Sequence, residues 1–148
     1  MKKEFQGKTF HELSHAPIHA LNGVATWSDD VAEKLKIRTV DELGRWRFYL
    51  RAKAMVALAS EEIEGHRIEG SKLNANKCLD KKFEGKSLHS ILELPPSAMA
   101  GLAEKADELL GGFHIHTIKE LGTWKIAGIA NAISTMANME TSDLNKHK

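Results

Sequence analysis

Apolar residues recur at helical spacing along this chain, and no segment shows the alternation of a strand with hairpin turns. The longest apolar segments run from Trp46 to Ser60 and from Trp124 to Met139, and both are rich in alanine. Shorter helices are predicted at Asp29–Lys36, with Ser28 as its N-cap, and at Lys105–Leu110. The pattern predicts an all-α fold.

Other helix starts are marked by threonine and proline. Thr9, Thr39 and Thr117 each stand three residues before a glutamate, which is the spacing of a capping box. Pro17 and Pro95 suit the first turn of a further short helix, because the missing proline N–H would have no partner there. Together these signals predict about five short helices in each half of the chain.

The chain also repeats itself at a constant offset of 78 residues. Residues 5–62 align with residues 83–140 without a gap, and 19 of the 58 aligned pairs are identical. The identical pairs are Phe5/Phe83, Gly7/Gly85, Lys8/Lys86, His11/His89, Pro17/Pro95, Ala20/Ala98, Gly23/Gly101, Ala25/Ala103, Asp29/Asp107, Ile37/Ile115, Thr39/Thr117, Glu42/Glu120, Leu43/Leu121, Gly44/Gly122, Trp46/Trp124, Ala52/Ala130, Ala54/Ala132, Ala59/Ala137 and Glu62/Glu140. Such self-similarity indicates two tandem copies of one helical module.

The predicted domain organisation therefore has four parts. Residues 5–62 and 83–140 are the helical repeats, 63–82 is a connector with few apolar residues, and 141–148 is a polar tail. A helical turn is expected in the connector near Lys77–Lys82. Each repeat has about 60 residues, near the lower limit for an independent core, so we expect the two copies to pack on each other as a pseudo-two-fold pair.

Composition excludes several classes of protein. The net charge is +1, and no segment has the strong basic character of a dedicated nucleic-acid binder. Cys78 is the only cysteine, so no intramolecular disulfide can form. The N-terminal residues lack the apolar run of a secretory signal, and no stretch reaches the roughly 18 apolar residues of a membrane span. We therefore expect a soluble, cytoplasmic protein with no membrane partner.

Each copy carries a glycine in a similar context between two predicted helices. The first reads Leu21-Asn22-Gly23-Val24-Ala25 and continues to Ile37-Arg38-Thr39, and the second reads Met99-Ala100-Gly101-Leu102-Ala103 and continues to Ile115-His116-Thr117. This pattern resembles helix-hairpin-helix domains, whose hairpins read hydrophobic-x-Gly-hydrophobic-Gly before a helix and an Ile-Lys-Thr segment. Ala25 and Ala103 replace the second glycine. The resemblance covers roughly residues 20–44 and 98–122, and implies one helical hairpin in each copy.

Domains of this kind often bind DNA without sequence preference, because hairpin N–H groups donate to phosphate. In this chain, acidic residues follow both hairpins: Asp29, Asp30 and Glu33 in the first copy, and Glu104, Asp107 and Glu108 in the second. Anions beside a phosphate site repel the ligand. These acidic residues favour a hairpin that serves in packing and in interaction with a partner. Weak, sequence-independent nucleic-acid binding is the alternative.

Two differences between the copies suggest contact with a partner. Trp27 stands where the second copy has Lys105, so the fold does not require a tryptophan there. Its side chain is either a partner contact at the hairpin tip or part of the core. Arg47 and Arg51 are spaced four apart on the long helix and form a basic face that suits an acidic partner or a solvated surface.

No arrangement of residues predicts catalysis or a metal site. His11, His15 and His19 are spaced four apart, but Pro17 interrupts the helix that would align them. Lysines near Cys78 would lower the pKa of its thiol and make it reactive, whereas an incidental exposed thiol is the simpler interpretation.

Four other side chains are interpreted from their position. Trp46 and Trp124 lead the longest helices and are expected to be core anchors. His114 and His116 flank Ile115, and we expect both histidines to face solvent around a buried isoleucine.

The sequence favours a non-catalytic interaction or scaffold module that binds another protein and needs no cofactor. The predicted contact residues are Gly23, Ala25, Trp27, Gly101, Ala103 and Lys105 at the hairpins, with Arg47 and Arg51 as the basic face. One alternative is weak nucleic-acid binding through the hairpins. Another is a small-ligand or cofactor carrier with a pocket between the repeats.

Overall fold

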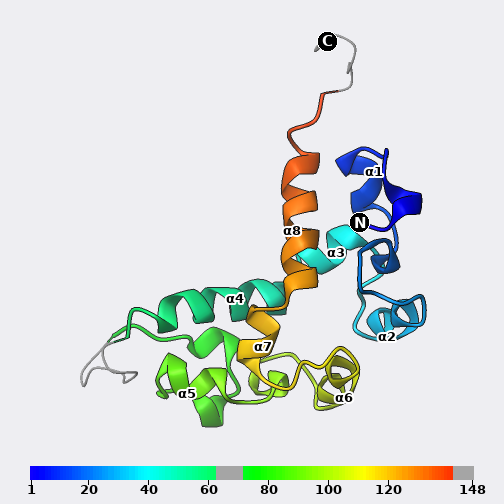
Figure 1. Cartoon of the computed structure of the whole chain (residues 1–148). Helices are drawn as coiled ribbons and strands as arrows, with labels where there is room; N and C mark the ends of the chain where they lie inside the picture. The colour runs from blue at the N-terminus through cyan, green and yellow to red at the C-terminus, as the bar shows by residue number, and fades with distance from the viewer. Residues whose placement is uncertain (63–71, 142–148) are drawn as a thin grey trace. The chain divides into compact units, whose positions relative to one another are not determined.

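The computed structural model describes residues 1–62 and 72–141, and helices connected by turns make up its secondary structure (Figure 1). The α-helices are α1 (Phe10–Ser14), α2 (Ser28–Lys34), α3 (Val40–Gly44), α4 (Arg47–Ala59), α5 (Leu88–Leu92), α6 (Lys105–Gly111), α7 (Ile118–Gly122) and α8 (Lys125–Ala137). Short 3₁₀ turns are η1 (Lys3–Phe5), η2 (Ile18–Ala20), η4 (Asn76–Cys78), η5 (Lys81–Phe83) and η6 (Pro96–Ala98). No β-sheet occurs among the described residues, so the all-α prediction is confirmed there.

Several predicted helix starts differ in detail from the structure. Pro17 and Pro95 precede single 3₁₀ turns and not α-helices, because each segment closes only one hydrogen-bonded turn before the hairpin. Ser28 does not cap α2. It is the first helical residue and is buried, and Trp27 occupies the N-cap position without a side-chain hydrogen bond. No described helix is long and apolar enough to cross a membrane.

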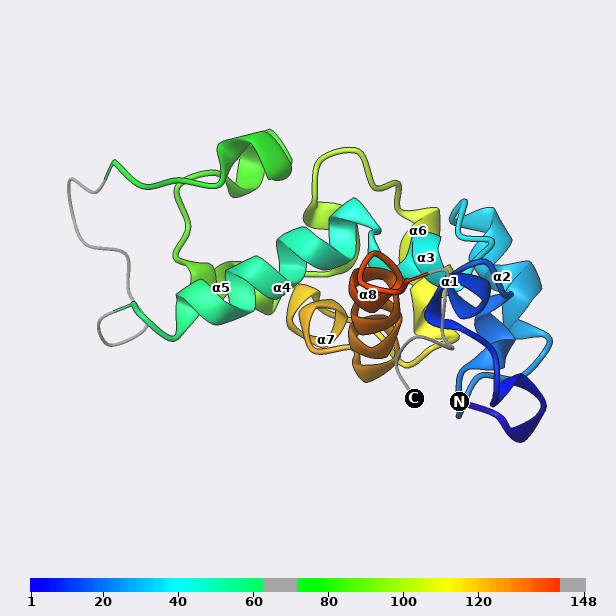
Figure 2. The ribbon, with the colours of Figure 1, turned by 90° about the horizontal axis from the view of Figure 1, so that it is seen from above.

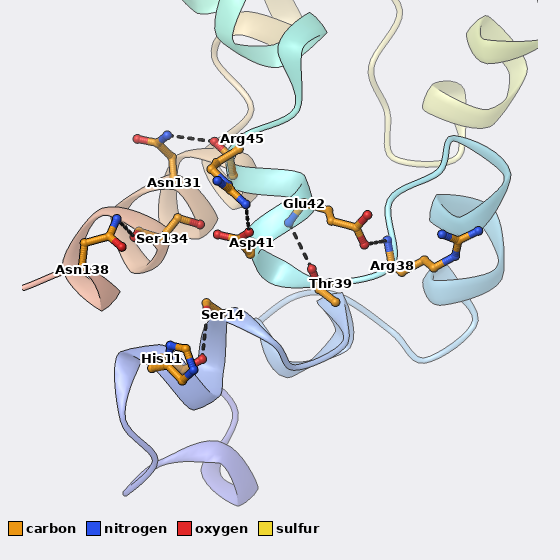
Figure 3. A network of polar contacts seen from close by, with 11 residues as sticks. His11, Ser14, Arg38, Thr39, Asp41, Glu42, Arg45, Asn131, Ser134 and Asn138 are labelled. Carbon is orange, nitrogen blue, oxygen red and sulfur yellow. Dashed lines mark hydrogen bonds and ion pairs between the residues drawn. The ribbon is translucent and has the colours of Figure 1, made fainter. Parts of the chain in front are cut away.

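The three threonine caps form as predicted, but the glutamate closes a full capping box only at α1. Thr9 and Glu12 make a full capping box at α1. The Thr39 hydroxyl accepts the Glu42 N–H of α3, while the Glu42 carboxylate accepts the Arg38 N–H at 3.1 Å, one residue before the cap (Figure 3). The same pattern holds at α7, where Glu120 accepts the His116 N–H at 2.9 Å. In both places the glutamate fixes the chain that enters the helix.

The described chain divides into two compact units. The first contains Met1–Trp46 and the C-terminal segment that begins at Lys125, and the second is Arg47–Trp124. These bounds differ from the sequence copies 5–62 and 83–140. The long helix α4 follows the first copy in sequence but belongs to the second unit, whereas α8 belongs to the first unit. Each unit is therefore completed by the long helix of the other copy.

In the first unit, α8 lies beside α3 and α1 (Figures 1 and 2). Gly44, the last residue of α3, makes this packing close, since a Cβ there would lie 2.5 Å from the carbonyl carbon of Ala130. The Asn131 amide donates to the Gly44 carbonyl at 2.8 Å (Figure 3). The buried side chains of the first unit include Leu13, Ile18, Leu21, Val24, Ile37, Val40, Leu43, Ala127, Ala130 and Ile133.

The second unit repeats this contact with exchanged elements. α4 packs against α7 and α5, and a Cβ on Gly122 at the end of α7 would lie 2.6 Å from the carbonyl oxygen of Ala52. Its buried side chains include Phe48, Tyr49, Met55, Ile91, Leu92, Met99, Leu110, Ile115, Ile118 and Leu121. The identities Gly44/Gly122 and Ala52/Ala130 thus mark one close helix contact in each unit.

The expected core tryptophans are only half-buried. Trp46 and Trp124 lie in the turns between α3 and α4 and between α7 and α8, where the chain leaves one unit for the other. The Trp124 ring lies 5.2 Å from the Phe113 ring in the second unit. Aliphatic side chains, with Phe48 and Tyr49, fill the buried positions instead.

Candidate protein-interaction surface

The two segments predicted to be hairpins, residues 21–25 and 99–103 and here called the first and second hairpin, each contain a turn that selects glycine. Gly23 and Gly101 have φ angles of +86° and +91°. In each hairpin the carbonyl two residues before the glycine accepts the N–H one residue after it, at 3.3 and 3.2 Å. Glycine adopts this left-handed backbone without the steric cost that a Cβ brings, as at the third position of a type II turn. Ala25 and Ala103 follow these turns and are exposed.

The shared aspartates brace the hairpins. Asp29 in α2 accepts the His19 backbone N–H at 3.2 Å and contacts the His19 ring Nδ1 at 2.5 Å. Asp107 in α6 accepts the Ser97 N–H at 2.9 Å and the Ser97 hydroxyl at 2.5 Å. Each carboxylate thus ties the start of its helix to the 3₁₀ turn before the hairpin. The identity Asp29/Asp107 has a structural explanation that needs no ligand.

Trp27 stands at the start of α2 and is 55% exposed, so its side chain is not part of the core. The side chain that is buried at the start of α2 is that of the next residue, Ser28. Of the two interpretations open from the sequence, the structure places the indole at the surface. A large aromatic ring exposed beside a turn is the kind of side chain that anchors protein interfaces.

An open cleft of about 880 Å³ lies at the second hairpin, and Ala103 and Lys105 are among the residues that line it. Its charged lining residues are the carboxylates Asp80, Glu104, Asp107 and Glu108 and the lysines Lys82 and Lys105. The carboxylates outnumber the cations, so the cleft repels a phosphate or another anionic ligand.

The predicted basic face lies on α4 in the second unit, where Arg47 and Arg51 are exposed. The Arg47 guanidinium lies over the Phe48 ring, 4.8 Å from its centroid, and a Cβ on Gly101 would lie 3.7 Å from Arg47 Nη2. The structure therefore brings Arg47 to the second hairpin. Gly23, Ala25 and Trp27 belong to the first unit.

Cys78 does not match either sequence interpretation. It is half-buried, and its thiol donates to the Ala75 carbonyl at 3.2 Å. Burial raises the pKa of the Cys78 thiol, and this effect outweighs the opposing charge of Arg51. A raised pKa lowers the thiolate fraction at neutral pH, which argues against the reactive-thiol interpretation.

The histidines lie in separate surroundings. The His11 and His15 rings are 4.7 Å apart, while His19 contacts Asp29 and the Phe5 ring. His114 and His116 are exposed. Among residues 1–62 and 72–141, no three His, Cys, Asp or Glu side chains gather in a group that could hold a metal ion.

Each long helix also presents an exposed apolar strip that was not predicted from the sequence. On α8, Ile129 and Met136 are each 44% exposed, with the exposed Ala132 between them, and Met139 is exposed in the turn just after the helix. On α4, Leu50 and Leu58 are 38% and 58% exposed, with Ala54 between them. The i, i+4, i+8 spacing of Leu50, Ala54 and Leu58 was visible in the sequence, but nothing there showed which face of the helix is buried.

Comparison with protein-family models, curated proteins and solved structures found no match to this chain.

Proposed function

We propose that this protein is a non-catalytic interaction module that binds another protein through the exposed faces of its long helices and the tip of its first hairpin. The observation that carries the proposal is the pair of exposed apolar strips on α4 and α8. Apolar side chains clustered on one exposed face mark interaction sites more than scattered single ones do. Trp27 adds an exposed aromatic anchor.

We further infer that the module consists of two tandem helix-hairpin-helix-like repeats. Several pairs at the 78-residue offset have equivalent roles, which supports this arrangement. Gly23 and Gly101 share a positive φ, Asp29 and Asp107 each brace a 3₁₀ turn, and Gly44 and Gly122 each approach a long-helix alanine.

Nucleic-acid binding through the hairpins is the weaker candidate. The position of Arg47 near Gly101 favours nucleic-acid binding, because it brings a positive charge to the second hairpin. However, carboxylates predominate in the cleft at that hairpin, and the Leu50 and Leu58 side chains give phosphate no partner. A protein partner accounts for both the charge and the exposed apolar area.

The test is affinity capture with the full chain, followed by mass spectrometry of the bound proteins. We expect a defined partner for the wild type, and a loss of most of it for a variant carrying Trp27→Ala, Leu58→Ser and Met136→Ser. Lys119→Ser, at an exposed polar position, is the matched control and should capture as much as the wild type. Equal capture by the triple variant, or no protein partner at all, would contradict the proposal.

A further inference from the structure

The helix α4 has two faces of different character. Phe48, Tyr49, Ala52, Met55 and Ala59 are buried and hold the helix in the second unit. The opposite face, here called the α4 face, consists of the exposed residues Arg47, Leu50, Arg51, Lys53, Ala54, Ala57 and Leu58. Because the inner side is packed, the α4 face is presented on a fixed scaffold.

The centre of the α4 face is apolar. Leu50, Ala54, Ala57 and Leu58 follow the i, i+4, i+7, i+8 spacing of a helix-packing strip. The strip spans two helical turns, or about 12 Å at 1.5 Å per residue. The two alanines let a second helix come close, while the two leucines offer side chains that can be buried on contact. The geometry suits a partner helix of similar spacing.

The flanks of the α4 face carry positive charge only. At 100° per residue, Arg51 lies on one side of the strip and Lys53 on the other, while Arg47 lies about one turn before Leu50, at the N-terminal end of the strip. The segment from Arg47 to Ala59 contains no Asp or Glu. In the part of the chain that the structure describes, no carboxylate lies within ion-pair distance of these three cations.

We infer that the α4 face binds an acidic amphipathic helix of another protein, an inference that rests on the proposed function. Carboxylates on both sides of an apolar stripe would meet the three cations while the stripes pack together. A second copy of the chain does not fit, because pairing two α4 faces brings like charges together. Nucleic acid is a poorer ligand, because its phosphates make no favourable contact with the leucines. A membrane surface is a poorer ligand because the α4 face has no aromatic side chain of the kind found on interfacial membrane helices.

The α8 helix provides an internal comparison. Positions 47, 51 and 53 correspond to Lys125, Ile129 and Asn131 at the 78-residue offset. The exposed strip of α8 therefore carries much less charge, although both long helices have an exposed apolar strip. Charge-dependent binding should be confined to α4.

The test titrates the ¹⁵N-labelled full chain with a synthetic helical peptide that has leucines at i, i+4 and i+7 and glutamates on both flanks. We expect chemical-shift changes in α4, and a dissociation constant that rises at least tenfold between about 50 and 300 mM salt. A peptide with lysines in place of the glutamates should shift none of these amides. Absence of shifts in α4, or equal binding of both peptides, would overturn the inference.

Charge reversal distinguishes the α4 face from other surfaces. The double variant Arg51→Glu, Lys53→Glu should bind the acidic peptide about tenfold more weakly or worse, because two attractions become repulsions. Lys125→Glu on α8 is the matched control and should leave the affinity unchanged. Both variants change only exposed positions, and circular dichroism checks that each keeps the wild-type helix content.

Two further probes and the capture experiment separate the remaining outcomes. Binding of duplex DNA or of phosphatidylserine vesicles at α4, tighter than that of the acidic peptide, would overturn the inference in favour of that class of ligand. Capture of a protein partner that survives Arg51→Glu, Lys53→Glu but is lost with Trp27→Ala and Met136→Ser would overturn this inference and leave the proposed function standing.

Discussion

Two glutamates show how single residues complete this fold. Glu62, just after α4, accepts the backbone N–H groups of Leu88 and His89 at 2.8 and 3.0 Å, at the first turn of α5. Glu140, just after α8, accepts those of Phe10 and His11 at 2.7 and 2.8 Å, at the first turn of α1. The first N–H groups of a helix have no partner within it. The identity Glu62/Glu140 therefore reflects an anchor between each long helix and a short helix of the same unit.

The carboxylate of Glu62 makes the second unit sensitive to acid. Burial raises its pKa, but hydrogen bonds from the His89 ring and from the Leu88 and His89 N–H groups outweigh this, so the pKa lies below its ordinary value of 4.5. A carboxyl whose pKa is lowered by folding stabilises the folded state above its unfolded pKa. That stability is lost as the pH falls through the folded pKa.

We therefore expect Glu62→Gln to lower the thermal midpoint at pH 6, and the difference from the wild type to shrink as the pH falls below about 4.5. Thermal unfolding followed by circular dichroism at pH 6 and pH 3 measures this. Glu61→Gln, at the exposed neighbouring position, is the control and should change little at either pH. A difference of the same size at both pH values would show that the carboxylate charge is not involved.

At the scale of elements, the main feature is the close contact between a short helix and a long one. The contact needs a residue without a side chain at the end of α3 and α7, because the long-helix backbone occupies the space that a Cβ would take. A methyl group on Gly44 would force α3 away from Ala130 of α8, and a methyl group on Gly122 would force α7 away from Ala52 of α4. Such overpacking against backbone cannot be relieved by a change of rotamer.

Gly44→Ala and Gly122→Ala are each expected to destabilise the protein by about 1–3 kcal/mol or more. Urea unfolding of the full chain measures the loss. Gly111→Ala is the control: it ends α6, and its Cβ would lie 3.5 Å from the His116 ring, an ordinary contact, so stability should be unchanged or slightly higher. A loss below about 0.5 kcal/mol at both Gly44 and Gly122 would contradict the close packing.

At the scale of the whole molecule, the compact units do not follow the sequence copies. Each copy leaves its unit after a tryptophan, at Trp46 and Trp124, and its long helix joins the other unit. An exchanged helix makes the two copies depend on each other, since neither contains all the elements that bury its own apolar side chains.

Removal of the residues after Trp124 tests this division. The truncated chain lacks α8, so the first unit should lose its core, while the second unit (Arg47–Trp124) keeps all of its helices. In a ¹H–¹⁵N spectrum we expect dispersed signals from 47–62 and 72–124 and collapsed signals from 1–46. Folded signals from 1–62 as a block would show instead that the sequence copy is the folding unit.

The sequence by itself determined the helical class, the hairpin glycines and most helix starts, because these depend on local backbone energetics. A left-handed turn selects Gly23 and Gly101, and a hydroxyl side chain caps α3 and α7 wherever they pack. The sequence also placed Arg47 and Arg51 on one helix, but did not reveal the apolar strip beside them.

Only the tertiary structure decided which long helix completes which unit, and therefore which side chains remain exposed. Ala52 and Ala54 show the reason: both are alanines on α4, shared with the second copy, yet one is buried against Gly122 and the other belongs to the α4 face. Because the two copies have similar sequences, their long helices present similar packing surfaces. The local sequence pattern therefore does not show whether a long helix packs on the short helices of its own copy or on those of the other copy. That choice rests on contacts between residues far apart in the chain, such as Gly44 with Ala130.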